Sequence, residues 1–146
     1  DAVGDAAVTA PDHTWVTRLP DEPVWVPGDR HRLHQLLTNL LANAREHTPA
    51  GVTVTAAVAV AGAAVELTVT DDGPDIDPEL LPHLFDRFMQ ANPSRARTSG
   101  GAGLGLPIVA AIARAHRGSV AVRSAGGQTV FRVRLPAHPA GQNPLP

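Results

Sequence analysis

Two asparagines with helical spacing are the first residues in this chain whose types suit a chemical task. Asn39 and Asn43 lie four positions apart in a run with the apolar period of an amphipathic helix, so they share one face. That face flanks the leucine stripe, which places the pair at the rim of a core. An amide oxygen is a suitable ligand for Mg²⁺, which prefers oxygen and keeps several waters. Taken alone, such a pair more often marks a solvent-facing helix surface.

An acidic pair followed by glycine, Asp71-Asp72-Gly73, stands where a predicted strand leaves its sheet. A carboxylate held at that point can accept a hydrogen bond from the exocyclic amino group of adenine, which guanine lacks. The same three residues are also common in turns. The motif by itself therefore leaves both interpretations open.

A glycine-rich segment, with glycines at 101, 103 and 105 and a proline at 107, opens a second predicted helix. Exposed backbone N–H groups at the positive end of a helix form an anion site that a triphosphate can approach closely. Proline suits a first helical turn, where a missing N–H costs little. A dinucleotide-binding fingerprint requires a strand directly before the glycines. Residues 92–100 read instead as a loop, which excludes that motif.

Composition excludes several classes of protein. All 12 basic residues are arginine, and phosphate-loop enzymes and protein kinases of the usual fold both need a lysine on the phosphates. The chain has no cysteine, so it has neither disulfides nor thiolate metal sites. Its net charge of −2 gives no reason to expect a nucleic-acid partner. No apolar stretch approaches the roughly 20 residues of a membrane-spanning helix, and no signal peptide is evident.

The order of predicted elements indicates an α+β fold in which a two-layer sandwich forms one domain. Asp29 is predicted to cap a helix that runs to about residue 47, and a second helix spans 104–116. A short helix fits residues 78–84, and 91–101 read as a mobile loop. Strands are predicted at 13–19, 24–26, 52–60, 64–71, 120–123 and 129–135.

Taken together and in order, these motifs resemble the catalytic ATP-binding domain of bacterial sensor histidine kinases. Residues 29–49 resemble the N box, 69–76 the first glycine box, 84–88 the F box, 101–106 the second glycine box and 126–136 the closing hairpin. The resemblance implies the Bergerat fold: a mixed, mostly antiparallel sheet covered on one face by about three helices, with a mobile ATP lid. The anti-sigma-factor serine kinases share this fold but carry a glutamate base at the position of Asn39.

The resemblance also implies the residues of an ATP·Mg²⁺ site. Asn43 would bind the metal, Asp71 the adenine, and Asn39 would be a polar residue of the pocket with no certain catalytic role. The expected nucleotide-binding residues are Asn39, Asn43, His47, Asp71, Gly73, Ile76, Arg87, Phe88, Arg95, Arg97, Gly101, Gly103, Leu104, Gly105 and Thr129.

Three positions depart from the family pattern. Glu46 stands where relatives usually carry lysine or arginine, and Arg45 beside it is expected on the other flank of the helix from Asn43. The phosphate cation is therefore expected among Arg87, Arg95 and Arg97. Asp75 replaces the last glycine of the first box, and Gln128 replaces a glycine of the closing hairpin.

The implied function is donation of the γ-phosphoryl group of ATP to a histidine on a dimerisation domain, which passes it to a response regulator. No phosphoacceptor motif occurs here, and the segment around His13 does not resemble one. We therefore expect residues 13–136 to form the catalytic domain, with 1–12 and 137–146 as flexible ends, and no autophosphorylation by this chain alone. The domain is expected to be cytoplasmic, with the full-length protein anchored in the membrane through other segments. A nucleotide-sensing module without phosphotransfer and a serine kinase are the alternatives.

Overall fold

The computed structural model describes residues 12–20, 26, 28–86 and 102–137. Two α-helices, α2 (Arg30–His47) and α4 (Ala102–Ala115), and a short 3₁₀ helix, η1 (Leu81–His83), are present in this part of the chain. The strands are β1 (Thr14–Arg18), β2 (Thr53–Ala61), β3 (Ala64–Asp71), β4 (Ser119–Ala125) and β5 (Gln128–Pro136).

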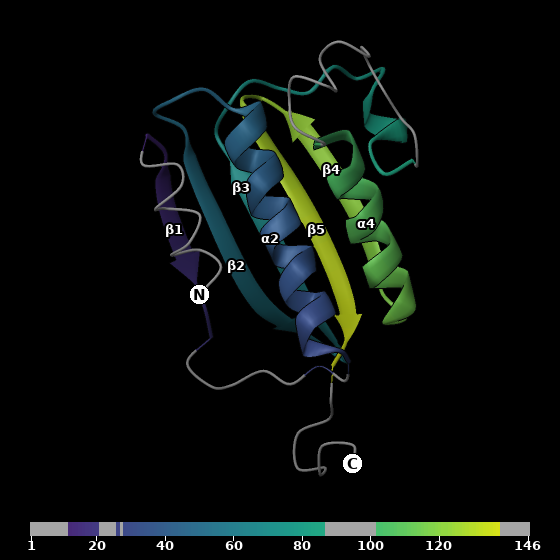
Figure 1. Cartoon of the computed structure of the whole chain (residues 1–146). Coiled ribbons are helices and arrows are strands. Elements are labelled where there is room, and N and C mark those ends of the chain that lie inside the picture. Colours follow the sequence, from purple (N-terminus) through teal and green to yellow (C-terminus); the bar gives the residue numbers. More distant parts are fainter. Residues whose placement is uncertain (1–11, 21–25, 27, 87–101, 138–146) are drawn as a thin grey trace.

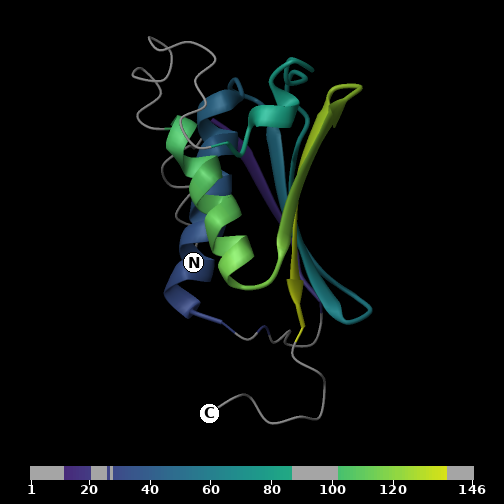
Figure 2. The same ribbon diagram turned by 90° about the vertical axis from the view of Figure 1, so that its right-hand side faces the viewer.

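The strands form one sheet in the order β1-β2-β3-β5-β4 (Figure 1). β1 pairs with β2 in parallel, and the other three pairs are antiparallel. Figure 2 shows α2 and α4 together on one face of the sheet. The predicted two-layer α+β sandwich is confirmed.

The core lies between the two helices and the inner face of the sheet. Successive side chains of a strand point to opposite faces of the sheet, and directly paired residues share a face. Ala56 of β2 pairs with Val69 of β3, and Val69 pairs with Phe131 of β5, so these three side chains lie on the same face. From α2, the leucine stripe enters this layer at Leu36 and Leu40, which are almost fully buried. The sequence pattern that predicted an amphipathic helix therefore identified the buried face.

The start of α2 is fixed by hydrogen bonds. The Asp29 carboxylate accepts from the backbone N–H groups of His31 (2.9 Å) and Arg32 (3.2 Å), as an N-cap does. The backbone N–H of Asp29 donates to Nε2 of His116 at 3.0 Å, and Nδ1 of that ring lies 2.8 Å from the carbonyl oxygen of Ile112. A carbonyl only accepts, so Nδ1 carries the proton and the ring joins the start of α2 to the end of α4.

Some boundaries differ from the prediction. α4 begins at Ala102, so Pro107 lies inside the helix rather than in its first turn. The predicted helix at 78–84 is reduced to one 3₁₀ turn, and the expected three helices become two α-helices with η1. Val26 belongs to no strand, and 24–25 lie outside the described residues. So do the loop at 91–101 and the predicted flexible ends, apart from Asp12 and Ala137.

Candidate functional site

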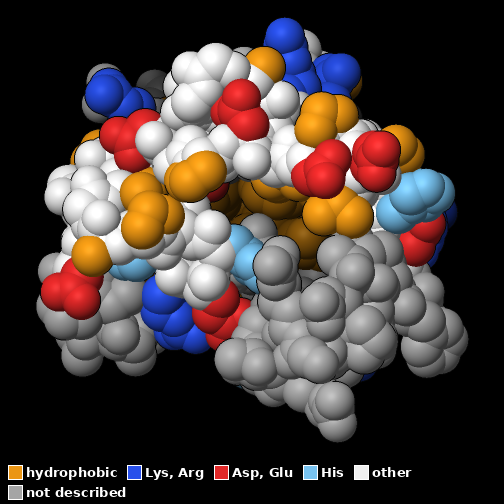
Figure 3. Space-filling model, turned by 90° about the horizontal axis from the view of Figure 1, so that it is seen from above, with side chains coloured by type: hydrophobic (Ala, Val, Ile, Leu, Met, Phe, Trp, Pro, Cys, Tyr) orange, Lys and Arg blue, Asp and Glu red, His pale blue; other side chains and the backbone are white. Residues whose placement is uncertain are grey.

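The expected site residues of α2, β3 and β5 gather at one end of the sandwich. α2 and β3 both end here and β5 begins here, with the Cα of Asp71 paired to that of Thr129. Figure 3 looks down on this end and shows a hollow near the centre of the surface, with hydrophobic side chains inside it. The topology therefore places polar groups from separate elements beside an apolar recess, which is typical of a ligand site.

The two aspartates at the end of β3 have different roles. Oδ1 of Asp71 accepts a hydrogen bond from the backbone N–H of Gly73 at 3.0 Å in a buried position. Asp72 is exposed, and its Oδ1 accepts from the backbone N–H of Thr53 at 2.8 Å, which fixes the start of β2. Asp71 is therefore the inward carboxylate, whereas Asp72 stabilises the sheet.

Burial is the main influence on the ionisation of Asp71, which is 5% exposed. Removal from water raises the pKa of this carboxyl, and the hydrogen bond from Gly73 opposes that effect. The charge of Asp72 raises the pKa further, whereas His13 lowers it. Among the described residues, Gly73 provides the only hydrogen bond to this carboxylate. An acceptor in this state suits a ligand that brings its own N–H donor.

Gly73 lies where there is little room for a side chain. A Cβ at this position would lie 3.0 Å from the Thr48 methyl carbon and 3.2 Å from Oδ1 of Asp71. Thr48 is the C-cap of α2, and its hydroxyl donates to the carbonyl of Ala44 at 2.6 Å. The loop after β3 therefore lies so close to the end of α2 that a side chain at residue 73 would require these neighbours to move by a few tenths of an ångström.

A chain of hydroxyl groups joins the loop after β3 to the closing hairpin. The backbone N–H of Ile76 donates to Oγ of Ser124 at 2.7 Å, and this oxygen lies 2.7 Å from Oγ1 of Thr129. Thr129 is 2% exposed. The expected residues Asp71, Ile76 and Thr129 are thus brought together, with Ser124 as the link between the last two.

Asn39, Asn43 and His47 lie along one side of α2 and differ in exposure. Asn43 is buried and only 8% exposed, Asn39 is intermediate and His47 is exposed. Neither amide has a side-chain hydrogen bond to any other described residue. The prediction that Asn43 stands at the rim underestimated its burial, because Ala44 beside it belongs to the core. A buried amide without a partner among the described residues is suited to an external ligand.

Glu46 and Arg45 form an ion pair beside the site. Nη2 of Arg45 lies 3.4 Å from Oε1 of Glu46, with both side chains about one third exposed or less (33% and 28%). An exposed pair of this kind contributes little to stability. Its consequence is electrostatic, since the acidic residue at the expected cation position is partly neutralised by its neighbour.

The remaining expected residues fall in or beside segments that the structure leaves out. Arg87, Phe88, Arg95, Arg97 and Gly101 lie outside the described residues. The backbones of Gly103, Leu104 and Gly105 lie within α4 rather than in a preceding loop. Phe85 of the expected F box packs edge to face on Phe131, with ring centres 6.2 Å apart. The start of this segment is therefore anchored in the core.

Sequence reasoning missed three groups that shape the site. Thr48 was considered only as the end of a helix, and Asp75 only as a departure from a pattern. Ser124 follows Val120 and Val122 at the strand period of two, a signal that places it on the inner face of the sheet. Contacts to the loop after β3 come from residues distant in sequence, which periodicity does not reveal.

Comparison with known proteins agrees with this geometry. Residues 28–139 match the family described as histidine kinase-, DNA gyrase B-, and HSP90-like ATPases. The chain belongs to this family, and it is an ATP-binding domain of the sensor histidine kinase type. The interpretation of this chain as a histidine-kinase ATP-binding domain is confirmed.

Named relatives and a solved structure support the assignment within the family. The sensor histidine kinase TrcS of Mycobacterium tuberculosis is 63% identical over 141 residues, which cover 93% of this chain and 28% of that protein. The probable sensor histidine kinase TcrY of the same organism is 51% identical, with 93% and 29% covered. The structure of the mycobacterial sensor histidine kinase MprB matches with a TM-score of 0.79, 27% identity, and 94% and 92% covered. This chain thus spans less than a third of the two sequence relatives.

Proposed function

We propose that residues 13–136 bind ATP·Mg²⁺ and serve as the catalytic domain of a sensor histidine kinase. Within the full-length protein, the domain would donate the γ-phosphoryl group to a histidine on a dimerisation domain, from which a response regulator receives it. The observation that carries this proposal is the buried Asp71 carboxylate, held by Gly73 and facing no other donor among the described residues.

The base would be recognised by this carboxylate. Asp71 would accept from the adenine amino group, with Thr129 alongside and Ile76 against the base. Asn39 and His47 would line the same pocket from α2. Guanine presents a carbonyl where adenine presents its amino group, so a carboxylate there disfavours it.

The metal would be held by Asn43. No cluster of three or more acidic or histidine side chains exists among the described residues. Mg²⁺ at a nucleotide takes most of its ligands from phosphates and water, so one amide oxygen is a sufficient protein contribution. When bound, the ion neutralises charge on the phosphates. The residues present therefore fit a nucleotide-associated Mg²⁺ rather than an independent metal site.

The triphosphate would extend toward the start of α4. Gly101, Gly103, Leu104 and Gly105 would provide backbone N–H groups at the positive helix end. Because Glu46 occupies the usual cation position, Arg87, Arg95 and Arg97 are the proposed sources of positive charge. If none of them serves, the chain would remain a nucleotide-sensing module without phosphotransfer.

The remaining proposals concern the whole protein. None of the described helices is long and apolar enough to cross a membrane. Attachment to a membrane would therefore come from other segments of the full-length protein, with this domain in the cytoplasm.

Two measurements test the proposed function. Calorimetric titration should give tighter binding of ATP·Mg²⁺ than of GTP·Mg²⁺, and EDTA should weaken the ATP complex. The chain joined to the dimerisation domain of its full-length protein should form acid-labile phosphohistidine from ATP, while the isolated chain should not. Nucleotide binding without phosphohistidine in the joined protein would support the sensing module instead.

A further inference from the structure

His13, just ahead of β1, makes a directed contact with the end of α2. Its Nε2 lies 2.7 Å from Oγ1 of Thr48. The Thr48 hydroxyl already donates its only hydrogen to the carbonyl of Ala44 at 2.6 Å. The histidine must therefore be the donor, which places the proton of the neutral ring on Nε2.

The other ring nitrogen argues against a purely stabilising role for His13. Nδ1 is buried and has no hydrogen-bond partner within the described part of the chain. A buried acceptor without a partner is unfavourable for folding. The ring does contact Trp15, with centres 5.8 Å apart, but an apolar side chain would make that contact without the unpaired nitrogen. The Nε2 donor is thus the feature that distinguishes histidine here.

Thr48 lies between His13 and the loop that holds the Asp71 carboxylate. Its methyl group lies against Gly73, where a Cβ would be only 3.0 Å away. Gly73 in turn donates its backbone N–H to Oδ1 of Asp71 at 3.0 Å. His13 is therefore connected to Asp71 by this series of contacts.

We infer that His13 is a positioning residue of the nucleotide site, which acts through Thr48 and Gly73 to orient Asp71 and to sharpen the choice of adenine over guanine. The inference rests on the proposed role of Asp71. A hydroxyl held by two hydrogen bonds has one rotamer, and that rotamer sets where the methyl group meets Gly73. Without the histidine donor, Thr48 keeps only the bond to Ala44, and the loop that supplies the Asp71 hydrogen bond gains freedom.

The decisive experiment compares ATP and GTP affinities by calorimetry for three proteins. His13→Leu removes the donor and should weaken ATP about fivefold while it leaves GTP nearly unchanged. His13→Gln places an amide N–H where Nε2 stands and should restore the ratio of the two affinities. An unchanged ratio in His13→Leu, or a ratio in His13→Gln that equals that of His13→Leu, would overturn the inference. A loss of thermal stability alone would indicate a merely structural residue.

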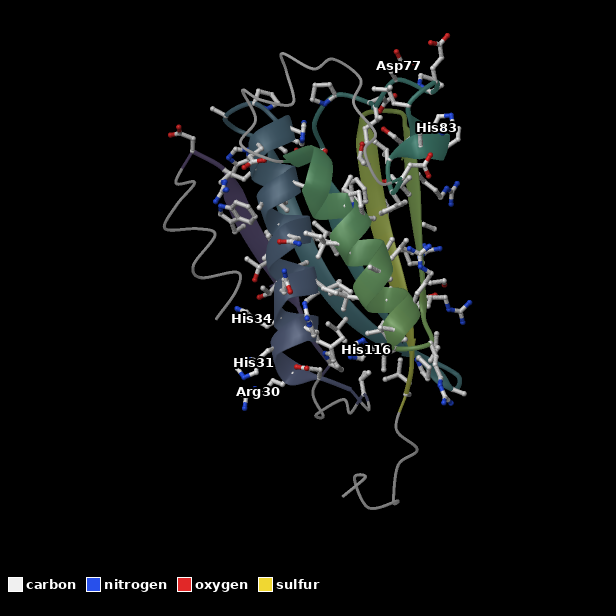
Figure 4. All side chains as sticks on the ribbon, turned by 45° about the vertical axis from the view of Figure 1, so that its right-hand side comes forward. Arg30, His31, His34, Asp77, His83 and His116 are labelled. Carbon is white, nitrogen blue, oxygen red and sulfur yellow. The ribbon has the colours of Figure 1, made fainter. Side chains whose placement is uncertain are left out.

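A double-mutant cycle tests whether the effect passes through Thr48. Thr48→Val keeps the methyl group and removes the hydroxyl, so adding His13→Leu to it should cause no further loss of ATP affinity. Additive losses would mean that His13 acts by another route and would refute the inference. His34→Leu is the matched control, because Figure 4 shows His34 in the lower part of α2, near Arg30 and His31 and away from the site.

Asp71→Asn separates this inference from the proposed function. If Asp71→Asn leaves the ratio of affinities unchanged, the proposed role of Asp71 fails, and the inference about His13 fails with it. If Asp71→Asn abolishes the preference for ATP while His13→Leu retains it, the proposed function stands and only the positioning role of His13 is refuted.

Discussion

Oδ1 of Asp75 accepts a hydrogen bond from the backbone N–H of Gly127 at 2.9 Å, which ties the loop after β3 to the turn between β4 and β5. A second bond between the same two segments joins the Ile76 N–H to Ser124. The resemblance to the family implies a glycine at the position of Asp75. The acidic residue thus anchors the loop in a defined position.

Replacing Asp75 with glycine should therefore loosen the base pocket. Asp75→Gly should weaken ATP and ADP equally, about three- to tenfold, because one loop anchor is lost and both nucleotides carry the same base. Hydrogen exchange of residues 73–77 should become faster. Asp75→Asn retains the acceptor oxygen and is the matched control, expected to bind as the wild type does. Tighter binding by Asp75→Gly would show that the anchor restrains rather than organises the site.

Asp71→Asn should separate binding from stability. In asparagine an NH₂ group replaces one of the two carboxylate oxygens. The N–H of Gly73 or the amino group of adenine would then face a second donor instead of an acceptor. We expect a loss of about 1–3 kcal/mol of ATP binding, or roughly 5- to 150-fold in affinity. Calorimetry measures this loss. ATP affinity unchanged by the substitution would remove Asp71 from the site.

The same variant should be more stable than the wild type without nucleotide. Because burial raises the pKa of Asp71 in the folded state, the folded protein holds this proton more tightly than the unfolded chain does. The wild type then loses stability as pH rises from the ordinary carboxyl pKa through the raised one. Asp71→Asn avoids this loss, so urea unfolding should favour it at pH 7 and the advantage should shrink toward pH 3. A variant less stable than the wild type at pH 7 would contradict the burial argument.

Local sequence signals predicted most of the elements but not all their boundaries. The helix from Asp29 was predictable because a capping carboxylate precedes a leucine stripe of regular period, and β3 matched residue for residue. The prediction of a helix at 78–84 was wrong, because its apolar pattern was too short to sustain more than one turn. Only Leu81–His83 form a 3₁₀ helix. α4 starts at Ala102 rather than at residue 104, so Pro107 lies inside the helix and not in its first turn as predicted.

Sequence motifs predicted only those site residues that lie within the motifs themselves. Asp71, Asn43 and Thr129 lie on regular elements, so their spacing placed them at one end of the sheet. The contributions of His13, Thr48 and Ser124 depend on contacts between segments far apart in sequence, 35 residues apart for His13 and Thr48. No local period encodes such contacts. The inward orientation of Asp71 follows from the strand period of two after Val65, Leu67 and Val69, and the hydrogen bond from Gly73 agrees with it.

Asn43→Ala should lose the Mg²⁺-dependent part of ATP affinity while the fold survives. The amide makes no hydrogen bond to another described residue, so its removal leaves no group in the described part of the chain unpaired. Leu40→Ala is the structural comparison, because Leu40 is fully buried and its truncation should cost about 2–5 kcal/mol. Titrations with and without EDTA, together with urea unfolding, measure both effects. If Asn43→Ala is destabilised as much as Leu40→Ala, the residue is part of the core rather than a ligand.

At the end of α4, Arg117 occupies the left-handed position of the capping motif that glycine usually fills, and the glycine, Gly118, comes one residue later. Gly118 N–H donates to Ala113 (2.7 Å) and Arg117 N–H to Arg114 (3.0 Å), the two bonds of a Schellman motif, and Arg117 has the left-handed φ of 62° that glycine usually supplies. Arg117→Gly should therefore raise stability by about 1 kcal/mol, or roughly 3 °C in Tm, because it relieves a side chain in that conformation. Gly118→Ala should lower stability by about 1–3 kcal/mol, since its Cβ would overlap the carbonyl oxygen of Arg134. Thermal unfolding of both variants checks the pair. A Gly118→Ala protein as stable as the wild type would show that α4 and β5 can separate at this point without cost, and that the close packing around Gly118 does not fix the end of the helix.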